Sequence, residues 1–174
     1  MSQFPAAYVA IIDPLIDAAR AVLERGERLV PVAFVGNLST GETHQVVIDP
    51  ACEQSKDNWG HLLRQLAEIH QADFMLVIMD AWGLPKDKVH RYQEIIGRCG
   101  SISASPYRID VVSFALETRH GLWAAQVPVK PKNVSKKKRT FDDPDFRLHT
   151  DTKGRFVDLL PVKEAEGQPA GGLH

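Results

Sequence analysis

The sequence is poor in cysteine and has no long hydrophobic run, and each shortage narrows what the chain can be. Its two cysteines, Cys52 and Cys99, lie far apart and show no CxxC or histidine spacing. This argues against a metal site or a redox pair and favours a reducing compartment. The apolar stretch near the N-terminus is interrupted by Asp13 and Pro14, so it fits neither a signal peptide nor a transmembrane span. We therefore expect a cytoplasmic protein without membrane contact.

Glycine-rich nucleotide-binding loops are also missing. The chain contains no P-loop sequence, no GxGxxG segment after a predicted strand, and no internal repeat of about 20 to 50 residues. We expect no bound cofactor. The remaining composition is ordinary, since 44% of the 174 residues are hydrophobic and 25% are charged. A chain of this size and composition is long enough for one globular domain with a substantial core.

The charge distribution changes sharply after Val129. Residues 1–129 carry 11 Lys or Arg against 15 Asp or Glu, whereas residues 130–139 contain six basic side chains and no acid. Periodic hydrophobic patterning also stops at this point. We predict a globular domain over residues 1–129, followed by a basic linker and C-terminal arm over residues 130–174. The last ten or so residues carry no apolar pattern and are expected to be flexible.

Hydrophobic periodicity predicts alternating helices and strands in the first half of the chain. Asp13 and Pro14 are typical of a helix start, and Gly26 of a helix stop. Alternatively, Tyr8, Ile11 and Ile12 add an earlier helical turn on the same face, with a bend at Pro14. Segments rich in β-forming residues at 29–35 and 45–48 predict an antiparallel hairpin. Asp57 then caps an amphipathic helix that is expected to pack on the sheet. The apolar stripe of this helix comprises Trp59, Leu62, Leu63, Leu66 and Ile69.

The next part of the chain predicts the centre and one side of the sheet. The continuous apolar run at residues 74–79 is typical of a strand buried on both faces. A short helix is expected at residues 89–99, and residues 109–117 and 122–129 predict a second hairpin. The order α-β-β-α-β-(α)-β-β predicts an α+β two-layer sandwich of about five mainly antiparallel strands, with two or three helices mainly on one face. Residues 156–162 are a candidate sixth strand.

The basic run after Val129 is a candidate nucleic-acid site. Flexible lysines displace counterions from phosphates and give salt-sensitive binding without base specificity. The run has no interleaved aromatic residues for base stacking, and the acidic segment at 142–145 follows closely enough to neutralise it. A solvated linker is the alternative interpretation. The candidate residues are Lys130, Lys132, Lys136, Lys137, Lys138 and Arg139.

The C-terminal arm contains widely spaced aromatic residues. Phe141, Phe146 and Phe156 resemble the anchors of a segment that lies across a surface, either on its own domain or on a neighbouring subunit. Since no catalytic motif stands out, the leading hypothesis is a non-enzymatic protein-interaction or assembly module. Such a module would use the arm to bind a protein partner or to form a homo-oligomer. Nucleic-acid binding through the basic run is the alternative function.

Two acids and one cation provide a second alternative. Asp80 closes the predicted central strand, and Glu117 precedes Arg119 at the end of a hairpin strand. The pattern loosely resembles the carboxylates and lysine of restriction-like nucleases, in which the carboxylates hold Mg²⁺. It departs from that family because an arginine stands in place of the lysine. The resemblance implies a metal-dependent hydrolase or nuclease, provided that the two carboxylates meet.

The histidines provide no obvious metal site. His61 and His70 lie nine residues apart in one predicted helix, which is 2.5 turns and therefore opposite faces. They cannot share an ion with each other. His90 and His120 are expected to be ordinary solvent-exposed side chains.

Overall fold

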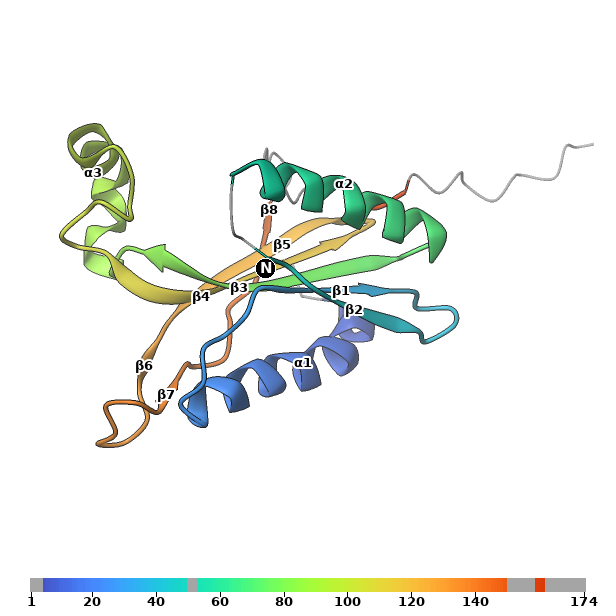
Figure 1. Ribbon diagram of the computed structural model, residues 1–174, viewed down its shortest axis with the longest axis horizontal. Coiled ribbons are helices and arrows are strands. Elements are labelled where there is room, and N and C mark those ends of the chain that lie inside the picture. Colours follow the sequence, from blue (N-terminus) through green and yellow to red (C-terminus); the bar gives the residue numbers. More distant parts are fainter. Residues whose placement is uncertain (1–4, 50–52, 150–158, 162–174) are drawn as a thin grey trace, which may run out of the picture.

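The computed structural model describes residues 5–49, 53–149 and 159–161. A six-stranded antiparallel sheet in the order β2-β1-β3-β4-β5-β8 forms its centre, and β6 pairs with β7 in a separate ladder (Figure 1). The predicted α+β class with an antiparallel sheet is confirmed. The elements are α1 (Ala6–Glu24), β1 (Val32–Gly36), β2 (Thr43–Val47), α2 (Glu53–Ile69), β3 (Phe74–Gly83), the 3-10 helix η1 (Lys86–Arg91), α3 (Tyr92–Cys99), β4 (Ile109–Thr118), β5 (Gly121–Pro128), β6 (Lys130–Pro131), β7 (Arg139–Thr140) and β8 (Arg147–His149).

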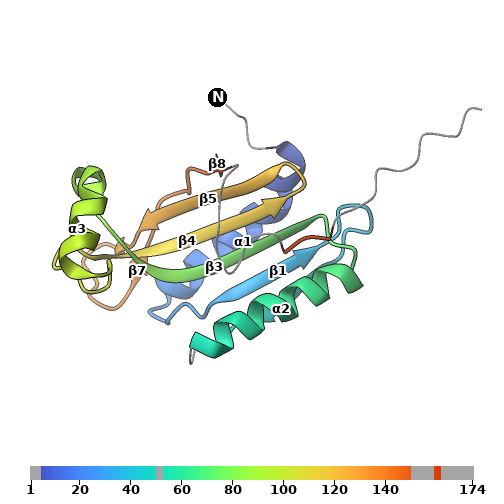
Figure 2. The same ribbon diagram turned by 90° about the horizontal axis from the view of Figure 1, so that it is seen from above.

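Both predicted hairpins form, and β3 lies between them. β1 pairs with β2 and β4 with β5, while β3 pairs with β1 on one side and β4 on the other. Seen from above, β1, β3, β4, β5 and β8 lie side by side in that order (Figure 2). The first five residues of β3 are all buried, as their continuous apolar pattern predicted. The central position of this strand is therefore confirmed.

The two long helices cover opposite faces of the sheet. Figure 1 shows α2 above the strands and α1 below them. Side chains alternate along a strand, so Leu76 and Ile78 join the core under α1, while Met75 and Val77 join the core under α2. The sequence predicted helices mainly on one face. A strand that is apolar at every position needs cover on both faces, which is why the helices are divided between them.

Helix α1 includes the earlier turn that was the alternative to a start at Asp13 and Pro14. It begins at Ala6 and contains Pro14 in its interior. Tyr8 and Ile12 are buried on the same face as the later turns, and this burial offsets the hydrogen bond that the proline removes. Pro14 lies on the exposed side of the helix. The predicted stop at Gly26 is confirmed, because this residue has a φ of 82° just after the last turn.

Helix α2 begins at Glu53, before the predicted cap at Asp57. Its buried stripe is also narrower than predicted. Leu63 and Ala67 are fully buried, whereas Leu62 is partly exposed and Ile69 is 71% exposed. Only the positions that directly face the sheet are covered, because no other described element lies over the flanks of this helix.

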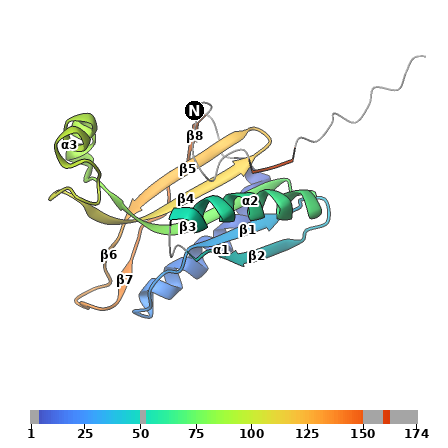
Figure 3. The same cartoon turned by 45° about the horizontal axis from the view of Figure 1, so that its top comes forward.

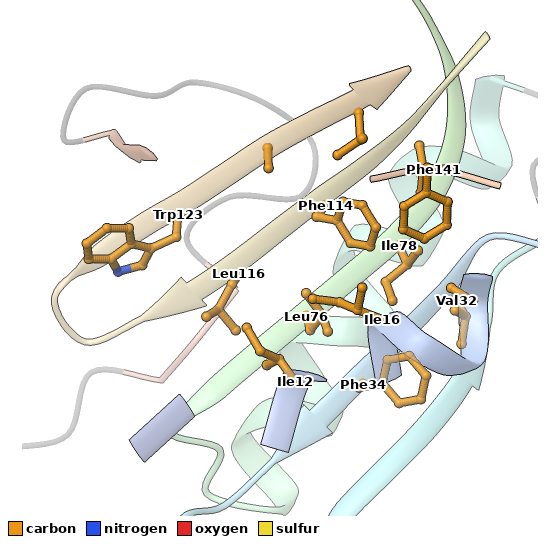
Figure 4. Close-up of a cluster of buried hydrophobic side chains, with 14 of the residues drawn as sticks. Ile12, Ile16, Val32, Phe34, Leu76, Ile78, Phe114, Leu116, Trp123 and Phe141 are labelled. Atoms are coloured by element: carbon orange, nitrogen blue, oxygen red, sulfur yellow. The ribbon is translucent and has the colours of Figure 1, made fainter. Parts of the chain in front are cut away.

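The arm packs on the body in the described part of the chain. Phe141 is 2% exposed and lies between α1 and β4, with its ring 5.6 Å from that of Phe114 (Figure 4). Phe146 packs at the margin of the same cluster, and Phe156 lies outside the described residues. The sixth strand is β8, which pairs with residues 122–124 of β5. The predicted strand at 156–162 lies mostly outside the described residues, and its described part, residues 159–161, is not in a strand.

Candidate functional site

The structure does not bring Asp80 and Glu117 together. Asp80 lies opposite Val112 in the β3–β4 register, five residues from Glu117, which is about 16 Å along the strand. The two side chains also point to opposite faces, because Asp80 shares the α1 face with Ile78 while Glu117 accepts the backbone N–H of Leu159 on the α2 face. They cannot bind one ion, so this pair does not support a metal-dependent hydrolase.

Arg119, the cation of that pattern, has a different partner. Its guanidinium forms an ion pair of 2.8 Å with Asp73, a buried carboxylate that also accepts the backbone N–H of Leu38. Burial, followed by the negative charge of Asp73, raises the pKa of the nearby Tyr8 hydroxyl. Asp73 is satisfied by these contacts and joins three chain segments. We interpret this cluster as structural.

The basic run folds into a hairpin. The short strands β6 and β7 pair, and the backbone N–H of Lys132 bonds to the carbonyl of Lys138 at 2.8 Å. At the turn, Asn133 adopts a φ of 55° and the hydroxyl of Ser135 accepts the N–H of Lys138. Asparagine tolerates this left-handed conformation better than most residues. The cations are therefore displayed on a defined loop.

Three of the six cations of the run lie at the root of the hairpin, and each of them forms an ion pair with an acid. Lys132 contacts Glu24 of α1 at 2.6 Å, and Arg139 contacts Asp110 of β4 at 3.2 Å. Lys130 pairs with Asp142, one of the acids expected to neutralise the run. The hydrogen bonds from Lys132 and then from the Thr140 hydroxyl hold the pKa of Glu24 below its usual value.

The other three cations form the tip of the hairpin. Lys136, Lys137 and Lys138 are all exposed, and none of them forms an ion pair with the described part of the chain. We call these residues the lysine tip. The lysine tip concentrates positive charge that no ion pair of the described residues neutralises.

A second basic feature projects from the far end of β3 and β4. Residues 84–108, which we call the α3 lobe, contain η1, α3 and the loop that follows, and they extend beyond the sheet (Figure 3). The α3 lobe carries five Lys or Arg residues and two acids, a net charge of +3. Ile95 anchors α3 in a small buried contact, while Tyr92 and Tyr107 remain 45% and 41% exposed.

Cations lie over the aromatic rings of this region. The Arg108 guanidinium is 4.5 Å from the ring centre of Trp82, which is 45% exposed at the root of the α3 lobe. Lys88 is 5.2 Å from the ring centre of Tyr107. An exposed ring with a cation over one face can stack on a base with its other face, while the cation contacts a phosphate. Residues 82–108 interleave aromatic and basic residues, so this pattern is visible in the sequence. It was not among the predicted nucleic-acid sites, which were confined to residues 130–139.

A cavity of about 520 Å³ joins the roots of the two features. Trp82 and Asp110 line it from the side of the α3 lobe, and Val129 and Arg139 line it from the side of the hairpin. Its charged lining is mixed and contains three acids, Glu27, Asp80 and Asp110, and two arginines, Arg28 and Arg139. The cavity places the α3 lobe and the hairpin at the same end of the sheet, as Figures 1 and 3 also show.

Within the described residues, no helix is both long and apolar enough to cross a membrane. Comparison with known proteins gives no further guidance: no family model, no curated protein and no solved structure matches this chain significantly. The chemistry of the basic end of the sheet is therefore the available basis for a functional proposal.

Proposed function

We propose that the protein binds single-stranded nucleic acid at the end of the sheet that carries the lysine tip and the α3 lobe. The observation that carries this proposal is the division of the basic hairpin: three cations at its root are paired with acids, while Lys136, Lys137 and Lys138 are exposed and form no ion pair among the described residues. Phosphates are the natural partners of such a group, because binding releases their condensed counterions.

The aromatic residues favour a single strand over a duplex. Exposed rings at Trp82, Tyr92 and Tyr107 can stack only on bases that are not already stacked within a double helix. Helix α3 is only eight residues long, and Arg98 is the single basic residue within it, so it does not have the character of a recognition helix. Backbone contact through cations combined with base stacking predicts binding with little sequence preference.

The arm is a weaker basis for a function. Protein interaction through its aromatic residues was the leading expectation from the sequence, but Phe141 and Phe146 contact the body of the same chain. An arm that binds a partner through these rings would first have to leave its own core. This cost favours the lysine tip over the arm as the interaction surface.

The first experiment measures fluorescence anisotropy of a labelled 20-nucleotide oligothymidine with the full chain at several salt concentrations. Replacing Lys136, Lys137 and Lys138 together by glutamine removes three phosphate contacts. The slope of log K against log salt concentration should then fall by about 2, since each single-strand contact contributes about 0.7. Replacement of the same lysines by arginine keeps the charge and should keep the binding. Unchanged affinity of the glutamine variant would exclude the lysine tip as the site.

The second experiment separates stacking from charge. Trp82→Ala and Tyr107→Ala should each weaken oligothymidine binding by about 5- to 150-fold, because one base–aromatic stack contributes about 1–3 kcal/mol. Neither change should affect retention on heparin, which has no bases. An equal loss for both polymers, or no loss for either, would contradict a nucleic-acid site. It would leave a general polyanion or acidic-protein surface as the better explanation.

A further inference from the structure

A separate cluster of metal-binding side chains lies at the opposite end of β3. Glu42, His44 and His70 each offer one ligand atom, and these atoms all lie within 4.8 Å of one another. They come from the start of β2 and from the end of α2, near Phe74 at the beginning of β3. The α3 lobe follows Gly83 at the other end of that strand. This cluster is therefore independent of the proposed nucleic-acid surface.

His70 is fixed by the way in which α2 ends. The N–H of Ala72 bonds to the carbonyl of Ala67, and the N–H of Gln71 bonds to the carbonyl of Glu68. Gln71 adopts a φ of 47°. These bonds form a Schellman motif in which His70 is the last residue before the left-handed position. The backbone of His70 is therefore well defined.

The loop between β1 and β2 is tied to the same place. The side-chain amide of Asn37 donates hydrogen bonds to the carbonyls of His70 and Gln71, at 3.3 and 2.9 Å. The backbone N–H of Asn37 also bonds to the carbonyl of Glu42 at 2.9 Å. One residue thus connects the segments that carry two of the three candidate ligands, which brings them together before any ion arrives.

His44 has a nitrogen that lacks a partner. Its Nε2 atom is buried and forms no hydrogen bond among the described residues, and the nearest carboxylate oxygen, on Glu42, lies 3.7 Å away. His44 belongs to β2 and lies opposite Val35 of β1. It is partly buried, as is Val46 two residues later on the same face of the strand. A buried nitrogen without a hydrogen bond is costly to the fold. An ion bound there would remove this cost.

The two imidazoles already lie against each other. The rings of His44 and His70 are stacked with their centres 3.7 Å apart and an angle of 23° between their planes. Coordination requires both rings to turn about their last torsion until the nitrogen lone pairs converge. That torsion is broad and costs little to change.

We propose that Glu42, His44 and His70 bind one zinc ion, with water completing the coordination. Two imidazole nitrogens and one carboxylate oxygen match a zinc site that keeps an open position, and nitrogen ligands disfavour Mg²⁺ and Ca²⁺. Donor atoms about 2.0–2.2 Å from a tetrahedral ion lie roughly 3.3 Å apart. The ligand atoms must therefore approach one another by up to about 1.5 Å. The ion would link the edge strand β2 to the end of α2.

The test is a zinc titration of the full chain by isothermal calorimetry, after dialysis against a chelator. One zinc ion per chain is expected, with no heat from Mg²⁺. His44→Ala and His70→Ala should each weaken the binding at least tenfold. Glu42→Gln should weaken it less; this change affects an exposed side chain and leaves the backbone contacts intact. His61→Ala, an exposed position on the same helix, is the matched control and should bind like the wild type.

X-ray absorption at the zinc edge should show only nitrogen and oxygen ligands near 2.0–2.1 Å, including the outer-shell signal of two imidazoles. A fall of that signal from two imidazoles to one in the His44→Ala variant would identify the ligand directly. Two results would overturn the proposal. One is the absence of stoichiometric binding by the wild type. The other is equal affinity in the wild type and in all three ligand variants, since the ion would then occupy histidines elsewhere in the chain.

Discussion

Replacing Phe141 with alanine tests whether the arm belongs to the folded core. The ring is 2% exposed, packs 5.6 Å from Phe114, and lies beneath the Arg20 guanidinium at 5.0 Å. Truncating a buried phenylalanine costs about 3–5 kcal/mol, and losing the cation–ring contact adds about 0.5–1 kcal/mol. The hydrogen bond from Arg20 to the carbonyl of residue 141 is untouched. We expect a loss of about 4 kcal/mol, a large share of a typical stability of about 5–15 kcal/mol.

Urea unfolding, followed by circular dichroism, measures this loss. With a slope of about 2 kcal/mol per molar urea, the midpoint should fall by about 2 M. Phe146→Ala is the matched control, because this ring lies at the margin of the core, 6.1 Å from Phe114, and its removal should cost only about 1–2 kcal/mol. Phe141→Leu keeps most of the buried volume and remains measurable if the alanine variant fails to fold. A loss below about 1 kcal/mol for Phe141→Ala, or a separate early transition of the arm, would refute the reasoning.

Further predictions concern Glu24, which holds the basic hairpin through Lys132, and two glycines. The pKa of Glu24 is lowered in the fold by its bond to Lys132, so its contribution to stability is present above pH 4.5 and is lost as the pH falls below that value. Glu24→Gln should flatten the fall of the urea midpoint below about pH 4.5, and parallel profiles for the two proteins would count against this anchor. A Cβ atom on Gly36 would lie 2.1 Å from the Phe74 ring, so Gly36→Ala should destabilise the protein by about 1–3 kcal/mol. Gly97, inside α3, has open space around it, and Gly97→Ala should stabilise that helix by up to about 1 kcal/mol, so the two glycine variants should shift the thermal midpoint in opposite directions.

The elements that sequence predicted best are those with a strong local signal. The apolar run that became β3 has no polar residue among its first six, and this pattern alone predicts a central strand. The β4–β5 hairpin follows equally from two strand patterns around Gly121, whose φ of 127° is typical of glycine. Both depend on neighbours that are close in sequence.

Distant contacts explain what the sequence did not predict. The run at 130–139 is held as a hairpin by Glu24, more than 100 residues earlier, whose carboxylate accepts hydrogen bonds from Lys132 and Thr140. Helix α1 continues through Pro14 because the sheet beneath it buries the preceding turns. Neither partner is visible in a short window of sequence.

The candidate sites show the same division. Asp80 and Glu117 both stand near strand ends in the sequence, but their side chains lie on opposite faces of the sheet. Only the strand register reveals this. His44 and His70 are 26 residues apart and meet because α2 returns alongside the sheet and ends at the loop before β2. Helical spacing excludes His61 as a partner of His70, whereas nothing in the sequence pattern connects His70 with His44.

The burial of Phe141 affects how the protein is made. Synthesis proceeds from the N-terminus at about 5–20 residues per second, so the segment 130–149 takes about 1–4 s to add. During that interval the apolar surface around Phe114 lacks the cover that Phe141 and Phe146 provide, and β5 lacks β8 at its outer edge. An unpaired edge beside an exposed apolar patch is the type of surface that associates with other chains. A ribosome that stalls within this segment would therefore hold a chain that is prone to associate with others.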